Sequence, residues 1–193
     1  MNRNAYALVG ATLLCFAVAV ARAQQPGKKS QSQTASPSAL YRSPSAFAEL
    51  PGKVALDLER RGCRIPQQAY TRKKTNVIHG EFARPGQIDW AALCSIHGVS
   101  PILVYWNGSE QSPAELERFE DRNWLWKDDA GHSQFMRGIG PVGKAYIMEH
   151  YRAYGGPTPP PIDHQGIDDY IAEKGSVTLY FYGGKWMKLT GAD

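Results

Sequence analysis

The feature that most constrains folding is an export signal in the first 23 residues. Arg3 precedes an apolar run from Leu8 to Val20, and the run is followed by a small-x-small cleavage site, Ala21-Arg22-Ala23. These parts in this order are typical of a secretory signal peptide, and the run is shorter than a membrane span requires. An uncleaved membrane anchor is the alternative. We expect cleavage before Gln24 and a mature protein that folds in an oxidising compartment, periplasmic or extracellular.

Three cysteines occur in the sequence, and Cys15 lies within the predicted signal. The mature chain then keeps Cys63 and Cys94, and an even pair in an oxidising compartment is typical of a disulfide. A metal thiolate pair and a reactive nucleophile are the alternatives. Both are disfavoured because neither cysteine has a CxxC partner and the histidines follow no zinc-ligand spacing. A bridge closing a loop of about 30 residues would stabilise the fold by about 3 to 4 kcal/mol.

Composition divides the remaining chain into two parts. Residues 24–46 are rich in Ser, Gln and Pro with few apolar side chains to bury, so we expect a disordered linker there. Residues 47–193 then form one globular domain. Five of the 22 basic residues precede residue 47, which leaves 17 against 18 acidic ones in the domain. We therefore expect neither nucleic-acid binding nor, after signal cleavage, an integral membrane protein.

Local patterns in the domain predict two to three helices. Pro51 to Gly62 has proline near a first turn, apolar residues at helical spacing and a glycine stop. A second helix follows Gly140-Pro141 and ends at Gly155. Ser112-Pro113 with Glu115 matches a capping box, which predicts a helix over the AELERF segment that follows.

The strand candidates are β-rich segments separated by Gly and Pro: residues 75–82, 88–96 and 100–106, then SVTLYFY and KWMKL near the C-terminus. The first three predict an antiparallel meander. The last two flank Gly183-Gly184, a two-residue turn typical of a hairpin. The prediction is an α+β domain, with a mostly antiparallel sheet, two to three packed helices, a C-terminal β-hairpin and one disulfide.

The segment from Gly80 to Leu93, GEFARPGQIDWAAL, resembles one FG-GAP or integrin-type repeat, whose strand-connecting loop binds calcium. Ala83 and Pro85 stand where the repeat needs oxygen ligands, and calcium takes six to eight of them. We expect a tight hairpin shaped by Pro85-Gly86, with Trp90 packed inward and no bound metal. A single copy does not predict a propeller.

Four motifs, in order, resemble an uncharacterised family of exported bacterial proteins: CRIPQ from Cys63, GEF with GQIDWAALCS up to Ser95, IDHQGIDD from Ile162, and GKWMKLTGAD at the end. This resemblance implies a bacterial periplasmic or secreted setting. It implies no catalytic or binding residue, because the family has no known activity.

The best candidate for chemistry is DHQGIDD. His164 and Asp168 are four residues apart and would share a helix face as a metal-ligand pair or an acid/base pair. Polar residues at a helix start, with Asp163 as the cap, explain the same spacing. The chain has no GxSxG, HExxH, P-loop or dinucleotide fingerprint.

The aromatic residues indicate a different class of function. Trp124 and Trp126 lie in the polar segment RNWLWKDDAGHS, and we expect them to be exposed as a surface for a glycan or protein partner. The favoured prediction is therefore a non-catalytic, exported binding or envelope-associated module without a cofactor. A small hydrolase or metal-binding protein centred on His164 and Asp168 is the alternative.

Overall fold

The computed structural model describes residues 40–193. The predicted signal peptide and residues 24–39 of the predicted linker lie outside this range. Within it, no helix has the length and apolar character needed to cross a membrane.

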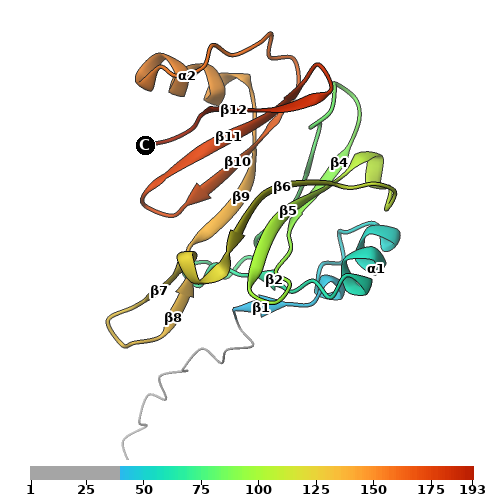
Figure 1. Ribbon diagram of the computed structural model, residues 1–193, viewed down its shortest axis with the longest axis vertical. Helices are drawn as coiled ribbons and strands as arrows, with labels where there is room; N and C mark the ends of the chain where they lie inside the picture. Colours follow the sequence, from blue (N-terminus) through green and yellow to red (C-terminus); the bar gives the residue numbers. More distant parts are fainter. Residues whose placement is uncertain (1–39) are drawn as a thin grey trace, which may run out of the picture. The chain divides into compact units, whose positions relative to one another are not determined.

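Two four-stranded antiparallel sheets make up most of the domain (Figure 1). The N-terminal sheet has the order β3-β4-β5-β6, with strands Val77–Gly80, Asp89–Leu93, Val99–Tyr105 and Ala114–Glu120. The C-terminal sheet has the order β9-β10-β11-β12, with strands Arg137–Val142, Gly166–Ile171, Gly175–Tyr182 and Lys185–Thr190. Each sheet is thus a meander of consecutive strands.

Short elements complete the described chain. The two α-helices are α1, Gly52–Arg60, and α2, Lys144–Tyr154. Two small two-stranded antiparallel sheets are also present. One pairs β1, Tyr41–Arg42, with β2, Ile65–Pro66. The other pairs β7, Leu125–Lys127, with β8, Ser133–Phe135. Three 3-10 turns are η2, Pro44–Ala46, η3, Trp106–Gly108, and η4, Asp121–Trp124.

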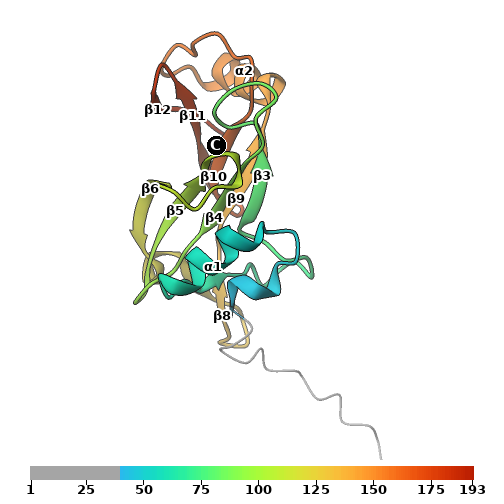
Figure 2. The same ribbon diagram turned by 90° about the vertical axis from the view of Figure 1, so that its right-hand side faces the viewer.

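The hydrophobic core consists of three clusters, because successive residues of a strand point to opposite faces of its sheet. The first core joins α1 to the outer face of the N-terminal sheet through Val54, Leu58, Ala92, Leu103 and Tyr105. The second lies between the sheets and contains Leu93, Ile102, Val104, Ile139, Ile167 and Leu179. The third joins α2 to the C-terminal sheet through Ile147, Ile162, Tyr180 and Leu189. The secondary-structure layers therefore follow the order helix, sheet, sheet, helix. Figure 2 shows α1 in front of its sheet.

Asn76 joins the two sheets along one edge. Its side-chain Nδ2 donates to Arg137 O at 3.3 Å, and its Oδ1 accepts from Ile139 N at 3.1 Å. The amide therefore pairs with β9 as a neighbouring strand would, beside the end of β3. Asn76 adopts a φ of 68°, a left-handed conformation that asparagine tolerates better than most residues.

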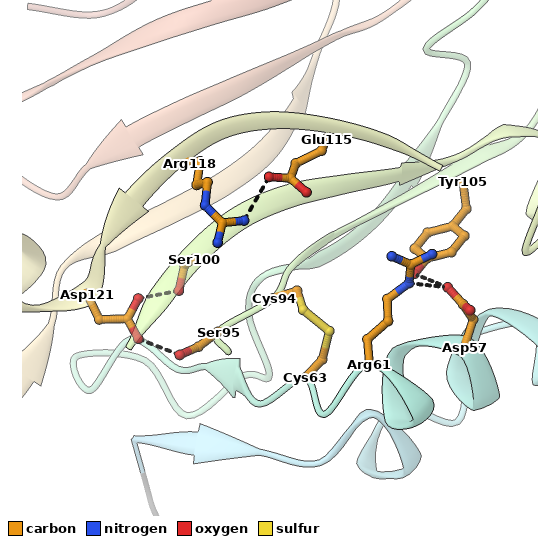
Figure 3. The surroundings of a disulfide bond; sticks show 10 residues. All are labelled: Asp57, Arg61, Cys63, Cys94, Ser95, Ser100, Tyr105, Glu115, Arg118 and Asp121. Carbon is orange, nitrogen blue, oxygen red and sulfur yellow. Dashed lines mark hydrogen bonds and ion pairs between the residues drawn. A yellow bond between two sulfur atoms is a disulfide. The ribbon is translucent and has the colours of Figure 1, made fainter. Parts of the chain in front are cut away.

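The predicted disulfide is confirmed. Cys63 and Cys94 are bonded, with 5.0 Å between their Cα atoms, and join the segment after α1 to the end of β4 (Figure 3). Beside it, Asp57 accepts hydrogen bonds from Arg60, Arg61 and Tyr105. Burial alone would raise the pKa of Asp57, but the hydrogen bonds from Arg61, Arg60 and Tyr105 outweigh it and lower the pKa below its ordinary value.

Asp121, on the other side of the disulfide, is buried. Its carboxylate accepts hydrogen bonds from the hydroxyls of Tyr41, Ser95 and Ser100, two of which are drawn in Figure 3. This contact ties β1 to the N-terminal sheet and supplies the buried carboxylate with three donors.

The coarse fold prediction is confirmed, with two α-helices where two to three were predicted. The helix predicted over AELERF is wrong, because that segment is the edge strand β6. Ala114 and Leu116 pack into the core between the sheets, and this burial outweighs the local helix signal. The linker boundary at residue 47 is also wrong, since Tyr41 and Arg42 pair with β2 and Pro44 is buried.

Candidate functional site

His164 and Asp168 do not form the predicted site. The predicted shared helix face is wrong, because residues 166–171 form strand β10. His164 is buried and stacks on Tyr180 with 4.4 Å between ring centroids. Its Nδ1 lies 2.9 Å from Gln165 O and its Nε2 3.0 Å from Phe181 O, so both ring nitrogens face backbone carbonyls. The contacts of both ring nitrogens are thus with the backbone, and they are separate from the partners of Asp168.

Asp168 has partners of its own on the outer face of the C-terminal sheet. Tyr146 in α2 donates its hydroxyl at 3.0 Å, and Thr178 in β11 donates at 3.3 Å. Burial raises the pKa of Asp168 despite the lowering effect of hydrogen bonds from Ser176, Tyr146 and Thr178. Among residues 40–193 no hydrogen bond or ion pair joins Asp168 to His164, and no three His, Cys, Asp or Glu side chains form a group that could hold a metal ion.

The segment resembling a calcium loop is a hairpin between β3 and β4, as predicted. Gly86 has a φ of 78°, the conformation expected at its turn. Asp89 is fully buried, and its carboxylate accepts four hydrogen bonds, from the backbone nitrogens of Phe82, Ala83 and Asn107 and from the side chain of Gln87. N–H donors surround this carboxylate, and they hold the loop in shape.

The two tryptophans predicted to be exposed differ from each other. Trp126 in β7 is 39% exposed, and Lys174 Nζ lies 5.1 Å from the centroid of its ring. Trp124, at the end of η4, is half-buried and packs edge-to-face against Phe119 with centroids 5.6 Å apart. The prediction of an exposed aromatic pair is therefore correct for Trp126 and wrong for Trp124.

Trp126 lies beside a large hollow of the described chain, which we call the hairpin hollow. It has a volume of about 860 Å³ at the turn between β10 and β11. Its lining includes Tyr70, Gln134, Asp168, Tyr170, Lys174 and Ser176. Trp126 is the cross-strand neighbour of Gln134, and Lys174 reaches over its ring, so the indole stands at the rim.

Two tyrosines give the hollow an aromatic wall. Tyr170 donates to Gln68 Oε1 at 3.0 Å, and Gln68 is buried. A Cβ at Gly138 would lie 2.4 Å from both Gln68 Nε2 and the Tyr170 ring, so only glycine allows this close approach. Tyr70 beside them is 53% exposed, and partial burial together with Tyr170 raises its pKa to about 12.

The hairpin hollow offers hydroxyl, amide, ammonium and carboxyl groups beside its aromatic side chains. Ser176 is the one hydroxyl in its lining besides the tyrosines; its Oγ accepts from Ala192 N at 2.7 Å and lies 3.2 Å from Tyr146 Oη. Ser176 also hydrogen-bonds to the Asp168 carboxylate, and no histidine or lysine hydrogen-bonds to its Oγ among the described residues. Exposed aromatic faces, an amide, an ammonium group and a carboxyl are instead suited to stacking and hydrogen bonding.

Sequence reasoning missed Tyr70, Gln134 and Tyr170. They are far apart in the chain, and the hollow exists only because Gln68 and Gly138 bring β10 next to the loop that carries Tyr70. The alternation of DDYI, with Tyr170 two residues after Asp168, was the one signal that could have placed these two on the same face. No family model matches the chain, and no curated protein or solved structure matches it significantly.

Proposed function

We propose that this protein is a non-catalytic, exported binding module that recognises a glycan through the hairpin hollow. The observation that carries the proposal is the placement of two exposed aromatic side chains, Tyr70 and Trp126, beside the hollow and its hydrogen-bonding groups. Sugar rings present C–H faces that stack on aromatic rings and hydroxyls that pair with amides and carboxylates. Exposed apolar side chains that gather at one place are typical of interaction sites, whereas single exposed ones are ordinary.

The polar groups in the hollow are arranged for a neutral polar ligand. Gln134 provides an amide, Lys174 an ammonium group and Asp168 a carboxyl. Asp168 is already held by Tyr146 and Thr178, which fixes its orientation before any ligand binds. Such preorganisation reduces the entropy lost on binding.

The cellular setting belongs to the same proposal. The export signature, the single disulfide and the resemblance to an exported bacterial family all support a periplasmic or extracellular location. A partner in that setting would be an envelope or surface glycan. The alternative, a hydrolase or metal protein centred on His164 and Asp168, is less favoured, because the two side chains have separate hydrogen-bond partners.

The test is a glycan array probed with the labelled mature protein, followed by calorimetry with the best-bound oligosaccharide. Trp126→Ala and Tyr70→Ala should each weaken binding by about 5- to 150-fold, because we take the stacking of a sugar ring on an aromatic side chain to be worth about 1 to 3 kcal/mol, the same as that of a nucleobase. The matched control is Tyr154→Ala, because Tyr154 is 52% exposed but lies at the end of α2 away from the hollow. Absence of any saturable glycan binding, or equal binding by all three variants, would contradict the proposal.

A further inference from the structure

Strand β3 has a free edge on the side of the second sheet. Among residues 40–193, β4 is the only strand that pairs with β3. Leu93 N donates to Asn76 O, and hydrogen-bonded pairs alternate along an antiparallel ladder. Val77 and His79 therefore direct their backbone N–H and C=O groups away from β4. In the described part of the chain these groups have no hydrogen-bond partner.

The neighbouring strand β9 does not pair with this edge, and a proline explains why. Figure 2 shows β3 and β9 side by side. Ile139 N donates to the side chain of Asn76, so the ladder alternation makes Pro141 the next residue of β9 that faces β3. Proline has no N–H, and β9 therefore offers no donor at that position. Beyond it, Gln165 N donates to Glu81 O at 2.9 Å and Gln165 Oε1 accepts from Glu81 N at 3.0 Å.

A hollow of about 610 Å³ lies along the free edge, between these two contacts. All four residues of β3, Val77–Gly80, line it on one side. Pro141 and Gln165 line it from the second sheet. We call this space the edge hollow. It shares no lining residue with the hairpin hollow, so the two sites can be tested separately.

The edge hollow has negative charge and free acceptors but no cation of its own. Glu49 and Glu81 are in its lining, which contains no lysine or arginine. The ion pairs within residues 40–193 use other carboxylates, so neither glutamate is neutralised by a basic side chain. The backbone carbonyls of Val77 and His79 add two acceptors without donors. A ligand with a positive charge and several N–H groups would satisfy all four.

An apolar surface lies beside these acceptors. His79 and Trp90 are cross-strand neighbours whose ring centroids are 4.9 Å apart, and both line the edge hollow. Ile88 also lines it and is 46% exposed. A cation is attracted to the face of an indole ring, and the aliphatic stem of a long basic side chain packs on apolar groups. The hollow therefore suits a cation that is attached to an apolar stem.

We propose that the edge hollow binds the guanidinium group of an arginine side chain from a polypeptide partner. A guanidinium group has five N–H donors in a planar fork and is less strongly hydrated than an ammonium group, so it can serve carboxylates and strand-edge carbonyls together. Free arginine is disfavoured, because Glu49 and Glu81 would repel its α-carboxylate. This site does not depend on the proposed glycan binding.

The test uses N-acetyl-arginine methylamide, which presents a guanidinium group as a peptide would. The matched compound is the citrulline analogue, in which a neutral urea group of the same shape replaces the guanidinium group. In a nitrogen-15 correlation spectrum, the arginine compound should shift the backbone amide signals of Val77 and His79 in a saturable manner. The citrulline compound should bind about tenfold more weakly, because hydrogen bonds to charged groups are the stronger ones. Free arginine should also bind more weakly than the blocked compound.

Two glutamate variants decide whether the binding is specific to this hollow. Glu81→Gln keeps the shape of the side chain and removes its charge, so the affinity for the arginine compound should fall about tenfold at low ionic strength. The matched control is Glu59→Gln, because Glu59 is an exposed glutamate of α1 that does not line the hollow. This control should bind the arginine compound as the wild type does.

Three outcomes would overturn the proposal. The first is that the Val77 and His79 signals do not shift, or shift linearly with the arginine compound without saturation. The second is equal affinity for the arginine and citrulline compounds. The third is equal affinity of Glu81→Gln and Glu59→Gln for the arginine compound, with melting curves showing that both variants are folded.

Discussion

The buried carboxylates of the N-terminal layer differ from those of the C-terminal layer. Asp89 accepts four N–H hydrogen bonds, Asp121 accepts from three hydroxyls, and Asp57 is held by two arginines and Tyr105. In the C-terminal layer burial is the dominant influence: it raises the pKa of Asp168, and it raises that of Asp169 even beside Arg137.

The layers differ in which influence dominates: hydrogen bonds lower the pKa of Asp57 in the N-terminal layer, whereas burial raises the pKa values of Asp168 and Asp169 in the C-terminal layer. In the N-terminal layer the carboxylates fix turns and strands, and their hydrogen-bonding capacity is used within the fold. In the C-terminal layer Asp168 lines the hairpin hollow and Asp169 lines a cavity of about 210 Å³, while Asp121 of the N-terminal layer lines a hollow of about 700 Å³. Perturbed ionisable groups beside cavities are typical of functional sites. The comparison agrees with our proposal that glycan recognition lies in the C-terminal layer.

Arg137→Leu should have the largest effect, because it leaves Asp169 buried without its partner. We expect the free energy of unfolding to fall by about 3 to 5 kcal/mol, measured by urea denaturation. The double variant Arg137→Leu/Asp169→Leu should recover most of the loss, since it removes both charges. A loss below about 1 kcal/mol for the single variant would show that the C-terminal layer tolerates an unpaired buried charge.

Removal of the disulfide should come next. Cys63→Ser/Cys94→Ser opens a loop with a sequence separation of 31 residues, and we expect a loss of about 3 to 4 kcal/mol. A reducing agent should lower the melting temperature of the wild type and leave that of the variant unchanged. Hydrogen exchange should accelerate more in α1 and β4 than in β10 and β11. Equal acceleration in both layers would mean that they unfold as one cooperative unit. That result would contradict a difference in rigidity between the N-terminal and C-terminal layers.

Asp57→Asn should cost about 1 to 2 kcal/mol at pH 7, because hydrogen bonds to a charged group are lost while the two arginines are partly exposed. The pKa of Asp57 is lowered in the folded state, so its contribution is present above the unfolded value of about 3.9. This stabilising contribution of Asp57 is lost as the pH falls through the lowered pKa of the folded state. Urea denaturation at pH 7 and in that acid range should show the difference between variant and wild type closing.

Asp168→Asn should have the smallest effect and the opposite pH dependence. The pKa of Asp168 is raised in the folded state, so the folded protein binds the proton more tightly than the unfolded chain. The stabilising contribution of protonated Asp168 is therefore lost from the wild type as the pH rises through the pKa of Asp168 in the folded state. The asparagine variant does not ionise and shows no such loss. We expect the variant to equal or exceed the wild type by about 1 kcal/mol or less at pH 7, and to lose this advantage below pH 4. A less stable variant at pH 7 would show that hydrogen bonds from Tyr146 and Thr178 outweigh burial.

Local sequence patterns predicted the elements with strong local causes. The glycine stop after α1 and the Gly183-Gly184 turn both matched the structure. The capping-box signal at Ser112 failed because the side chains of β6 gain more from burial against the second sheet than a short helix would gain from its cap. The same limitation applied to His164 and Asp168, whose spacing fits a helix face and a strand face equally well.

The sequence alone determined the disulfide pair, the two helices, the antiparallel meander and the C-terminal hairpin, because each follows from contacts between neighbours in the chain or from an even cysteine count. The tertiary structure decided which polar groups are used within the fold and which line a cavity. Gln68 meets Tyr170 beside Gly138, and Arg137 of β9 lies over the ring of Phe119 in β6, through contacts between residues distant in sequence. No local pattern encodes such a meeting, since it depends on how the layers pack and on which edge of the sheets Asn76 joins.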